Sequence, residues 1–343
     1  SVRSITVHSM PNAISGILSV CQGLTTALSN TSTGGTWSSS NTTVAIVGSS
    51  SGVVQGFSAG TTNITYTLPT GCTATSIVTV HPLPATIDGS NTVCTGVTTL
   101  LSNTVAGGTW GVSNPAIAIV TTSGVGAGTV TGISAGTTIV TYTLPTGCIA
   151  TMPMTVNTSP AAISGTTSVC EFQTTTLTNP TPSGIWTSSN TAVATVLTSS
   201  GVVSGIASGT ATITYMLSSG CVATTMVTIL PIPSAIIGTL NICPGTFSTL
   251  SSIPLGGTWS SSATATAVIG SASGIASGVV PGTVTITYTL PTGCFNTAMV
   301  VVNPLPSAIT GSPVVCEGAS TLYTTTSTGG SWTSNNTTVA TVS

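Results

Sequence analysis

The chain has 343 residues but only four charged side chains, Arg3, Asp88, Glu171 and Glu317, and no lysine. A soluble domain is usually about a quarter charged, and without clustered basic residues the sequence excludes nucleic acid and anionic membrane surfaces as electrostatic partners. The lack of any uninterrupted run of about 18 apolar residues argues against a transmembrane helix in this sequence.

The formal net charge is −2 at pH 7. So small a charge removes the mutual repulsion that keeps identical protein molecules apart in solution. We therefore expect identical chains to associate side by side into a homo-oligomeric fibre or bundle.

Three markers repeat along the chain with one period of about 73 residues, which is slightly longer once. The nine cysteines alternate between a long interval, such as Cys21 to Cys72, and a short one, such as Cys72 to Cys94. Every tryptophan follows a cysteine at one fixed distance, as Trp37 follows Cys21, and four tyrosines precede a cysteine at another, as Tyr66 precedes Cys72. A fixed period of this kind indicates an array of one module.

The prolines Pro11, Pro84, Pro160, Pro233 and Pro306 recur with the same period and mark the predicted module starts. Both ends of the sequence cut through a module, so we expect it to be part of a longer polypeptide. The predicted organisation is the last strand of a preceding module at 1–10, complete modules at 11–83, 84–159, 160–232 and 233–305, and the first half of a further module at 306–343.

Each module is predicted to be an all-β sandwich, because Thr, Val, Ile and Tyr dominate the sequence and favour strands, with frequent glycine turns between them. In the first module, strict alternation over Asn63–Leu68 puts Ile64 and Tyr66 on a core face and Thr65 on an outer face. Pro153 places the last strand of its module at a sheet edge, because proline has no N–H to donate. The seven strands expected in the first module lie near 13–20, 25–28, Trp37, 44–47, 53–54, 63–68 and 73–80.

The segments Trp186–Asn190, Val193–Val196, Ser200–Gly205 and Gly209–Tyr215, with their counterparts in the other modules, resemble the group 2 bacterial immunoglobulin-like repeats of invasin- and intimin-type adhesins. The resemblance extends over essentially the whole chain. It implies tandem immunoglobulin-like β-sandwiches in a long secreted surface protein. The regular cysteines and the missing charge depart from that family's pattern, and a shared fold of this kind implies little about function.

The cysteines are predicted to form disulfides, because metal sites need closely spaced ligands and a nucleophilic cysteine needs a neighbouring base. Oxidised cysteines place the protein outside the cytoplasm, either secreted or at a cell surface. Bridges either close individual modules or cross their boundaries, as Cys72 with Cys94 would. We favour one disulfide within each module, with the partner of Cys316 outside this sequence: Cys21 with Cys72, Cys94 with Cys148, Cys170 with Cys221, and Cys243 with Cys294.

The periodic aromatic residues are predicted to anchor the module cores, with stacking on carbohydrate as the alternative role of the tryptophans. They are Trp37, Trp110, Trp186, Trp259, Trp332, Tyr66, Tyr142, Tyr215 and Tyr288.

No enzymatic activity, metal site or cofactor is predicted. Catalysis requires acids, bases or metal ligands gathered at one place, and a calcium site requires several carboxylates around one ion. The three acidic residues are far apart in the sequence, and the two histidines, His8 and His81, precede linker prolines.

The sequence therefore predicts the structural repeat region of an extracellular bacterial filament, stalk or adhesin, with identical chains as partners. The alternative is a binding module whose Thr-rich strand faces engage a ligand, either a glycan, which a cell surface could present, or ice. The alternating residues Thr283, Thr285, Thr287 and Thr289 form one such face.

Overall fold

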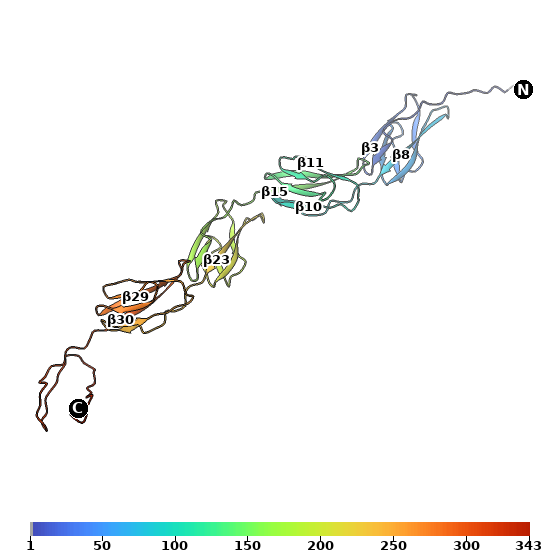
Figure 1. Ribbon diagram of the computed structural model, residues 1–343. Coiled ribbons are helices and arrows are strands. Elements are labelled where there is room, and N and C mark those ends of the chain that lie inside the picture. The colour runs from blue at the N-terminus through green and yellow to red at the C-terminus, as the bar shows by residue number, and fades with distance from the viewer. Residues whose placement is uncertain (1–2) are drawn as a thin grey trace. The chain divides into compact units, whose positions relative to one another are not determined.

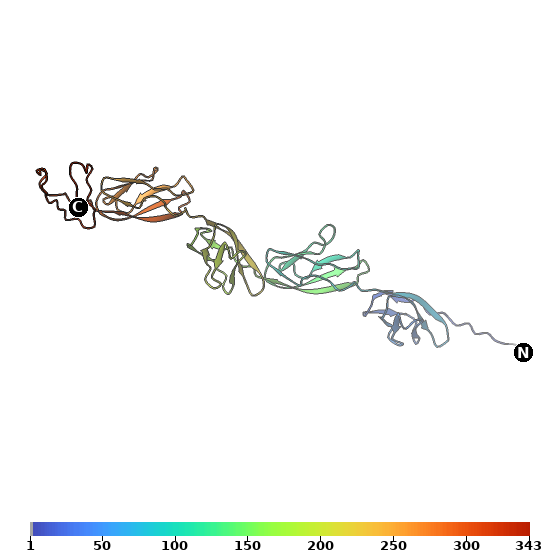
Figure 2. The ribbon, with the colours of Figure 1, turned by 90° about the horizontal axis from the view of Figure 1, so that it is seen from below.

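A computed structural model describes residues 3–343, and within that range the chain is all-β, without a helix. Both views show each module as two facing layers of strands (Figure 1, Figure 2). The predicted fold class of tandem β-sandwich modules is therefore confirmed. No segment of residues 3–343 forms a helix of the length and apolarity needed to cross a membrane.

The first module contains strands β1 to β8. One sheet has the order β2-β8-β7-β4, and the other has the order β1-β3-β6-β5. The bounds are β1 Ser15–Gly16, β2 Ser19–Cys21, β3 Thr25–Ser29, β4 Thr36–Ser39, β5 Ala45–Val47, β6 Val53–Gly56, β7 Gly60–Thr67 and β8 Thr73–His81.

The second module contains strands β9 to β15, in sheets of order β11-β14-β15-β9 and β10-β13-β12. Here the segment equivalent to β1 makes only an isolated bridge, between Asp88 and Ser102. The bounds are β9 Thr92–Cys94, β10 Thr98–Leu100, β11 Thr109–Val112, β12 Ala118–Val120, β13 Thr129–Gly132, β14 Gly136–Thr143 and β15 Ile149–Asn157.

The third module repeats the sheets of the first, as β17-β23-β22-β19 and β16-β18-β21-β20. The bounds are β16 Ser164–Gly165, β17 Ser168–Cys170, β18 Thr174–Thr178, β19 Ile185–Ser188, β20 Ala194–Val196, β21 Val202–Gly205, β22 Gly209–Met216 and β23 Val222–Leu230.

The fourth module repeats the sheets of the second, as β24-β30-β29-β26 and β25-β28-β27. Its last two strands, β29 and β30, are paired along their whole length (Figure 1). The bounds are β24 Asn241–Ile242, β25 Phe247–Thr249, β26 Thr258–Ser261, β27 Ala267–Ile269, β28 Ile275–Gly278, β29 Gly282–Thr289 and β30 Phe295–Val302.

The first predicted strand, near 13–20, is divided between the two sheets. Its first part, β1, pairs with β3, and its second part, β2, pairs with β8 in parallel, with Cys21 opposite His81. All other predicted strands of this module occur at the expected places. The parallel pair has a functional consequence, because it places the first cysteine of a module beside the end of the module's last strand.

The core of each module is built on a tryptophan and a tyrosine from neighbouring strands. Trp37 of β4 lies opposite Tyr66 of β7, and their ring centroids are 4.7 Å apart. The tyrosine hydroxyl donates to the Ser32 carbonyl at 2.7 Å and accepts from the Gly35 N–H at 2.9 Å. Because the hydroxyl is satisfied in this way, the whole tyrosine can be buried. The equivalent ring pairs, with centroids 4.5 to 4.7 Å apart, are Trp110–Tyr142, Trp186–Tyr215 and Trp259–Tyr288.

Pro153 lies within β15. The prediction that this strand lies at a sheet edge is wrong. β15 pairs along its length with β14, and β9 covers its other side from Thr155 to Asn157. Pro153 lies just before this covered stretch, at a point where the second side of β15 has no strand partner. The missing N–H therefore costs no ladder hydrogen bond, although the strand as a whole is internal.

Residues 306–343 form no strand and make one isolated bridge, between Thr310 and Thr324. The prediction of Trp332 as a core anchor is wrong in this structure, because its side chain is 39% exposed. In complete modules the tryptophan strand pairs with a tyrosine strand, and this segment contains no counterpart of β7 to cover the ring.

The chain forms two compact units. The first contains the chain up to Ala161 together with Pro180–Gly184 and Met216–Ala223, and the second contains the rest.

Candidate functional site

The cysteines are the residues that set this chain apart, and the structure bridges six of them between successive modules. Each bridge joins the first cysteine of one module to the second cysteine of the next, with Cα atoms 5.7 to 5.8 Å apart. The sequence separations are 127, 127 and 124 residues. The bridges are Cys21–Cys148, Cys94–Cys221 and Cys170–Cys294.

The predicted pairing within modules is therefore wrong, and so is the alternative pairing of Cys72 with Cys94. Each of the four modules takes part in a disulfide, but every bridge is shared by two modules. Cys72, Cys243 and Cys316 are free thiols in the described chain, although the sequence predicts the first two to be bridged.

The reason lies in the geometry of the last strand. Cys21 pairs with His81 at the final residue of β8, whereas Cys72 immediately precedes Thr73, the first residue of β8. Nine residues of strand span about 30 Å, so the two cysteines of one module lie at opposite ends of the sandwich. Cα atoms more than about 7 Å apart cannot be bridged without backbone movement. Both cysteines adjoin turns, but the turns lie at opposite ends.

The second cysteine of each module closes a tight turn. In the second module the Leu144 N–H donates to the Cys148 carbonyl at 2.9 Å, and the Gly147 N–H donates to the Leu144 carbonyl at 2.9 Å. Gly147 has φ +84°, a conformation that glycine adopts at little cost. The same hydrogen bonds form the turns that end at Cys72, Cys221 and Cys294.

Burial of this turn cysteine accompanies bridging. Cys148 is 1% exposed and Cys221 and Cys294 are 0% exposed, whereas the unbridged Cys72 in the same turn is partly exposed. The Cys72 Sγ atom contacts the His8 carbonyl oxygen at 3.8 Å. Bridging therefore shields the sulfur of the second cysteine from solvent, and reductants reach a buried sulfur poorly.

The first cysteine of each module is followed by a turn with one residue at positive φ. In most modules that residue is a glycine, such as Gly96 with φ +77°. In the third module it is Phe172, with φ +64° and a side chain 72% exposed. The N–H of Phe172 donates to the Gly205 carbonyl at 2.9 Å, as the equivalent glycine N–H does in other modules.

The remaining polar residues do not gather into a site. No group of three or more His, Cys, Asp or Glu side chains converges within residues 3–343. Glu171 accepts a hydrogen bond from the Ser208 N–H at 2.6 Å and thereby ties together two loops of its module. His8, Asp88 and Glu317 are exposed, and His81 is partly exposed at the end of β8.

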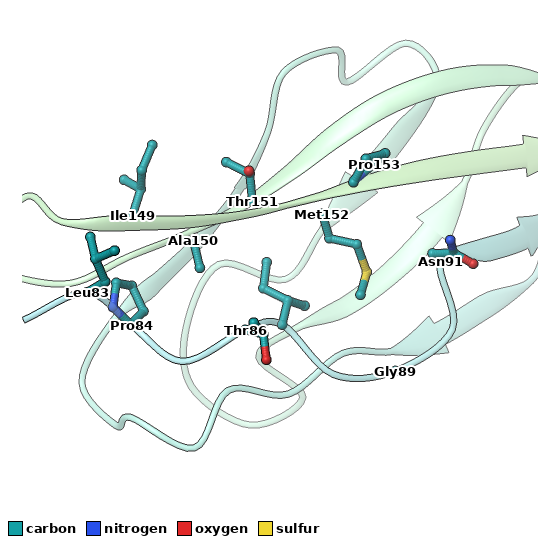
Figure 3. Close-up of a pocket in the computed structure, with 11 residues that line it drawn as sticks. Leu83, Pro84, Thr86, Gly89, Asn91, Ile149, Ala150, Thr151, Met152 and Pro153 are labelled. Atoms are coloured by element: carbon teal, nitrogen blue, oxygen red, sulfur yellow. The ribbon is translucent and has the colours of Figure 1, made fainter. Parts of the chain in front are cut away.

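A groove of about 590 Å³ lies in the second module between residues 83–91 and the first half of β15. Figure 3 shows Ala150 and Met152 pointing toward the 83–91 segment, whereas Thr151 and Pro153 point to the other side of the strand. No ionisable side chain lines the groove. It occupies the stretch of β15 that β9 leaves uncovered, and it offers apolar contact without a group for catalysis or metal binding.

No protein family model matches the chain, and no match to a curated protein was found. Among solved structures, domains 1–6 of the surface layer protein SbsC are 16% identical, with a TM-score of 0.21, covering 89% of this chain and 56% of that one. The bacterial integrin-binding protein invasin is 13% identical, with a TM-score of 0.31 and coverage of 87% and 81%. Protocadherin gamma B2 extracellular cadherin domains 3–6 are 11% identical, with a TM-score of 0.21 and coverage of 87% and 100%.

Proposed function

We propose that this chain is a structural repeat region of an extracellular bacterial filament, stalk or adhesin, in which identical chains associate through their sheet faces. The observation that carries the proposal is the disulfide pattern. Every bridge joins one module to the next, so successive modules are connected both by the backbone and by a disulfide. Such bridges couple neighbouring modules to one another, which suits a structural array.

An extracellular location follows from the same bridges, because disulfides persist in oxidising compartments and are rare in the cytosol. The assignment to a bacterial surface protein rests on the resemblance of the repeat motif described above.

Association of identical chains is supported by exposed apolar side chains at equivalent places on the β8-type strands. Ile77 is 60% exposed, and its counterparts Met226 and Met299 are each 63% exposed. Almost no charge surrounds them to oppose contact between chains. Because the positions repeat with the module, contacts between chains could form at more than one of them, and several weak contacts reinforce one another.

Sedimentation velocity of the oxidised chain over a range of concentrations, with electron microscopy of the same samples, tests this proposal. We expect bundles or fibres that grow with concentration. Lysine at Ile77, Met226 and Met299 should abolish them. A control with the same added charge, lysine at the exposed loop residues Val125, Leu255 and Val314, should retain them. A wild-type chain that stays monomeric at all concentrations would contradict self-association.

A second candidate function is ligand binding through the outer threonine face. The strand register places Thr36, Thr67 and Thr73 in one row and Ser38, Thr65 and Thr75 in the next. A repeated array of hydroxyl and methyl groups suits a glycan or an ice surface. Binding to a glycan array or thermal hysteresis would favour this candidate, and a negative result in both would leave the structural role alone.

A further inference from the structure

We infer that the disulfides route mechanical tension through short backbone segments and shield the greater part of each sandwich from it, which limits how far the array can extend. This inference rests on the proposed structural role. Its basis is the connectivity of the three bridges, and it specifies which segments of the chain carry tension.

The shortest covalent route through the array omits most of the chain. Along the backbone, Cys21 and Cys294 are separated by about 270 residues, which corresponds to about 950 Å when fully extended. Through Cys21–Cys148 and Cys170–Cys294, the route between the same two residues contains only the segment from Cys148 to Cys170. Fully extended, this route of about 22 residues reaches about 90 Å, including the two bridges.

Much of the backbone in the segment from Cys148 to Cys170 is already in the extended conformation of a β-strand. It contains β15, β16 and β17, which together make up more than half of its residues. Residues 22–147 and 171–293 lie inside closed covalent loops. Unfolding these residues adds nothing to the maximal distance between Cys21 and Cys294. Tension applied between those two residues therefore does not favour their unfolding.

The third bridge, Cys94–Cys221, has a different place in this network. A route from Cys148 to Cys170 that uses this bridge follows the backbone back from Cys148 to Cys94, crosses to Cys221, and then follows the backbone back to Cys170. It contains about 105 residues and could extend to about 370 Å. It therefore carries no tension while the direct segment is intact. It does hold the array together if the direct segment breaks.

Single-molecule force spectroscopy of the full chain, held at its two ends, tests the inference. Two double variants form a matched pair, since each removes one bridge with a loop of similar length. C170S/C294S removes a bridge on the shortest route, and the next route from Cys21 to Cys294 is longer by about 105 residues. C94S/C221S removes the bridge that carries no tension in the intact array, and it leaves the shortest route unchanged. Maximal extension depends on covalent connectivity, so the comparison uses molecules of each variant in which non-reducing peptide mapping shows the two remaining bridges.

We expect C170S/C294S to increase the maximal extension by about 370 Å and C94S/C221S to leave it unchanged. Addition of a reductant to the wild-type chain should produce stepwise unfolding and a roughly tenfold longer reach between Cys21 and Cys294. Module-sized unfolding steps in the oxidised wild-type chain, or equal lengthening in both variants, would overturn the inference. Because single molecules are held apart, the outcome is independent of self-association, and either proposal can fail without the other.

Discussion

The Cα atoms of Cys21 and Cys148 lie 5.7 Å apart although 127 residues separate them in the sequence. The bridge between them joins the end of β2 in one module to the turn before β15 in the next. It therefore sits at a module junction, close to the backbone linker that makes the other connection.

Replacement of Cys148 by serine should leave Cys21 without a partner. The denatured, non-reduced wild-type chain should present three reactive thiols, those of Cys72, Cys243 and Cys316, and C148S should present four. Alkylation followed by mass spectrometry of peptic peptides measures both numbers. A disulfide-linked peptide containing Cys21 and Cys72 in the wild-type protein would contradict the structure.

A single backbone cut anywhere from residue 22 to 293 should leave the pieces joined, because the three disulfide loops overlap and together enclose this whole range. A protease recognition sequence inserted after Gly124, in the loop where Val125 is 105% exposed, provides the test. Non-reducing electrophoresis should show no fragment after cleavage, and reduction should release two.

The control for this cleavage is the same sequence inserted after Ser320, beyond the last bridge. Cleavage there should release a C-terminal fragment without reductant. Release of fragments from the Gly124 site under non-reducing conditions would show that the loops are not closed as described.

Replacement of Phe172 by glycine should stabilise the third module by about 1 kcal/mol, because a residue other than glycine loses about 1 to 2 kcal/mol in the left-handed conformation. The exposed Phe172 side chain recovers little of this loss by packing. Hydrogen exchange of amides in β17 and β18 measures the change. The reverse substitution, Gly96→Phe, should destabilise the second module by a similar amount. No gain on Phe172→Gly would mean that the ring contributes contacts of its own.

Replacement of Tyr142 by phenylalanine should destabilise the second module by about 2 kcal/mol, because it leaves two backbone groups unpaired. The hydroxyl donates to the Val105 carbonyl at 2.7 Å and accepts from the Gly108 N–H at 2.9 Å. Hydrogen exchange of β11 and β14 amides reports the loss, while the ring packing against Trp110 is preserved.

Tyr323→Phe serves as the comparison, because the Tyr323 side chain is 39% exposed and lies in a segment without strands. It should change no exchange rate in the four modules. Equal effects of the two substitutions would argue that the buried hydroxyl contributes nothing.

Most of the strands could be predicted because the alternation of apolar and polar residues that indicates a strand lies within the strand's own sequence. In Gly60–Thr67 the alternation of apolar and polar residues is complete, and Ile64 and Tyr66 are indeed 0% and 5% exposed. The division of the first strand into β1 and β2 was not predictable in this way, because it depends on two partners, β3 and β8, that lie far along the chain.

The disulfide pattern could not be predicted from spacing because spacing does not reveal at which end of a sandwich a cysteine lies. The missing information was the parallel pairing of β2 with β8, which puts Cys21 beside His81. With that pairing known, the bridge within a module is excluded by distance, and the nearest second cysteine is the one in the turn of the following module. Trp332 shows the same limitation, since a periodic position indicates a core residue only where the covering strand is present.

The separation of Cys21 from Cys72 along β8 also determines when oxidation can safely occur. In an unfolded chain, closure of the shorter loop from Cys21 to Cys72 is favoured about fourfold over closure from Cys21 to Cys148, so early oxidation would join Cys21 to the wrong partner. Once the first module has folded, about 30 Å of strand keeps the two thiols apart, and Cys21 stays reduced until the next module presents Cys148. Folding of each module thus prevents the wrong disulfide within it and leaves its first cysteine available for the bridge to the next module.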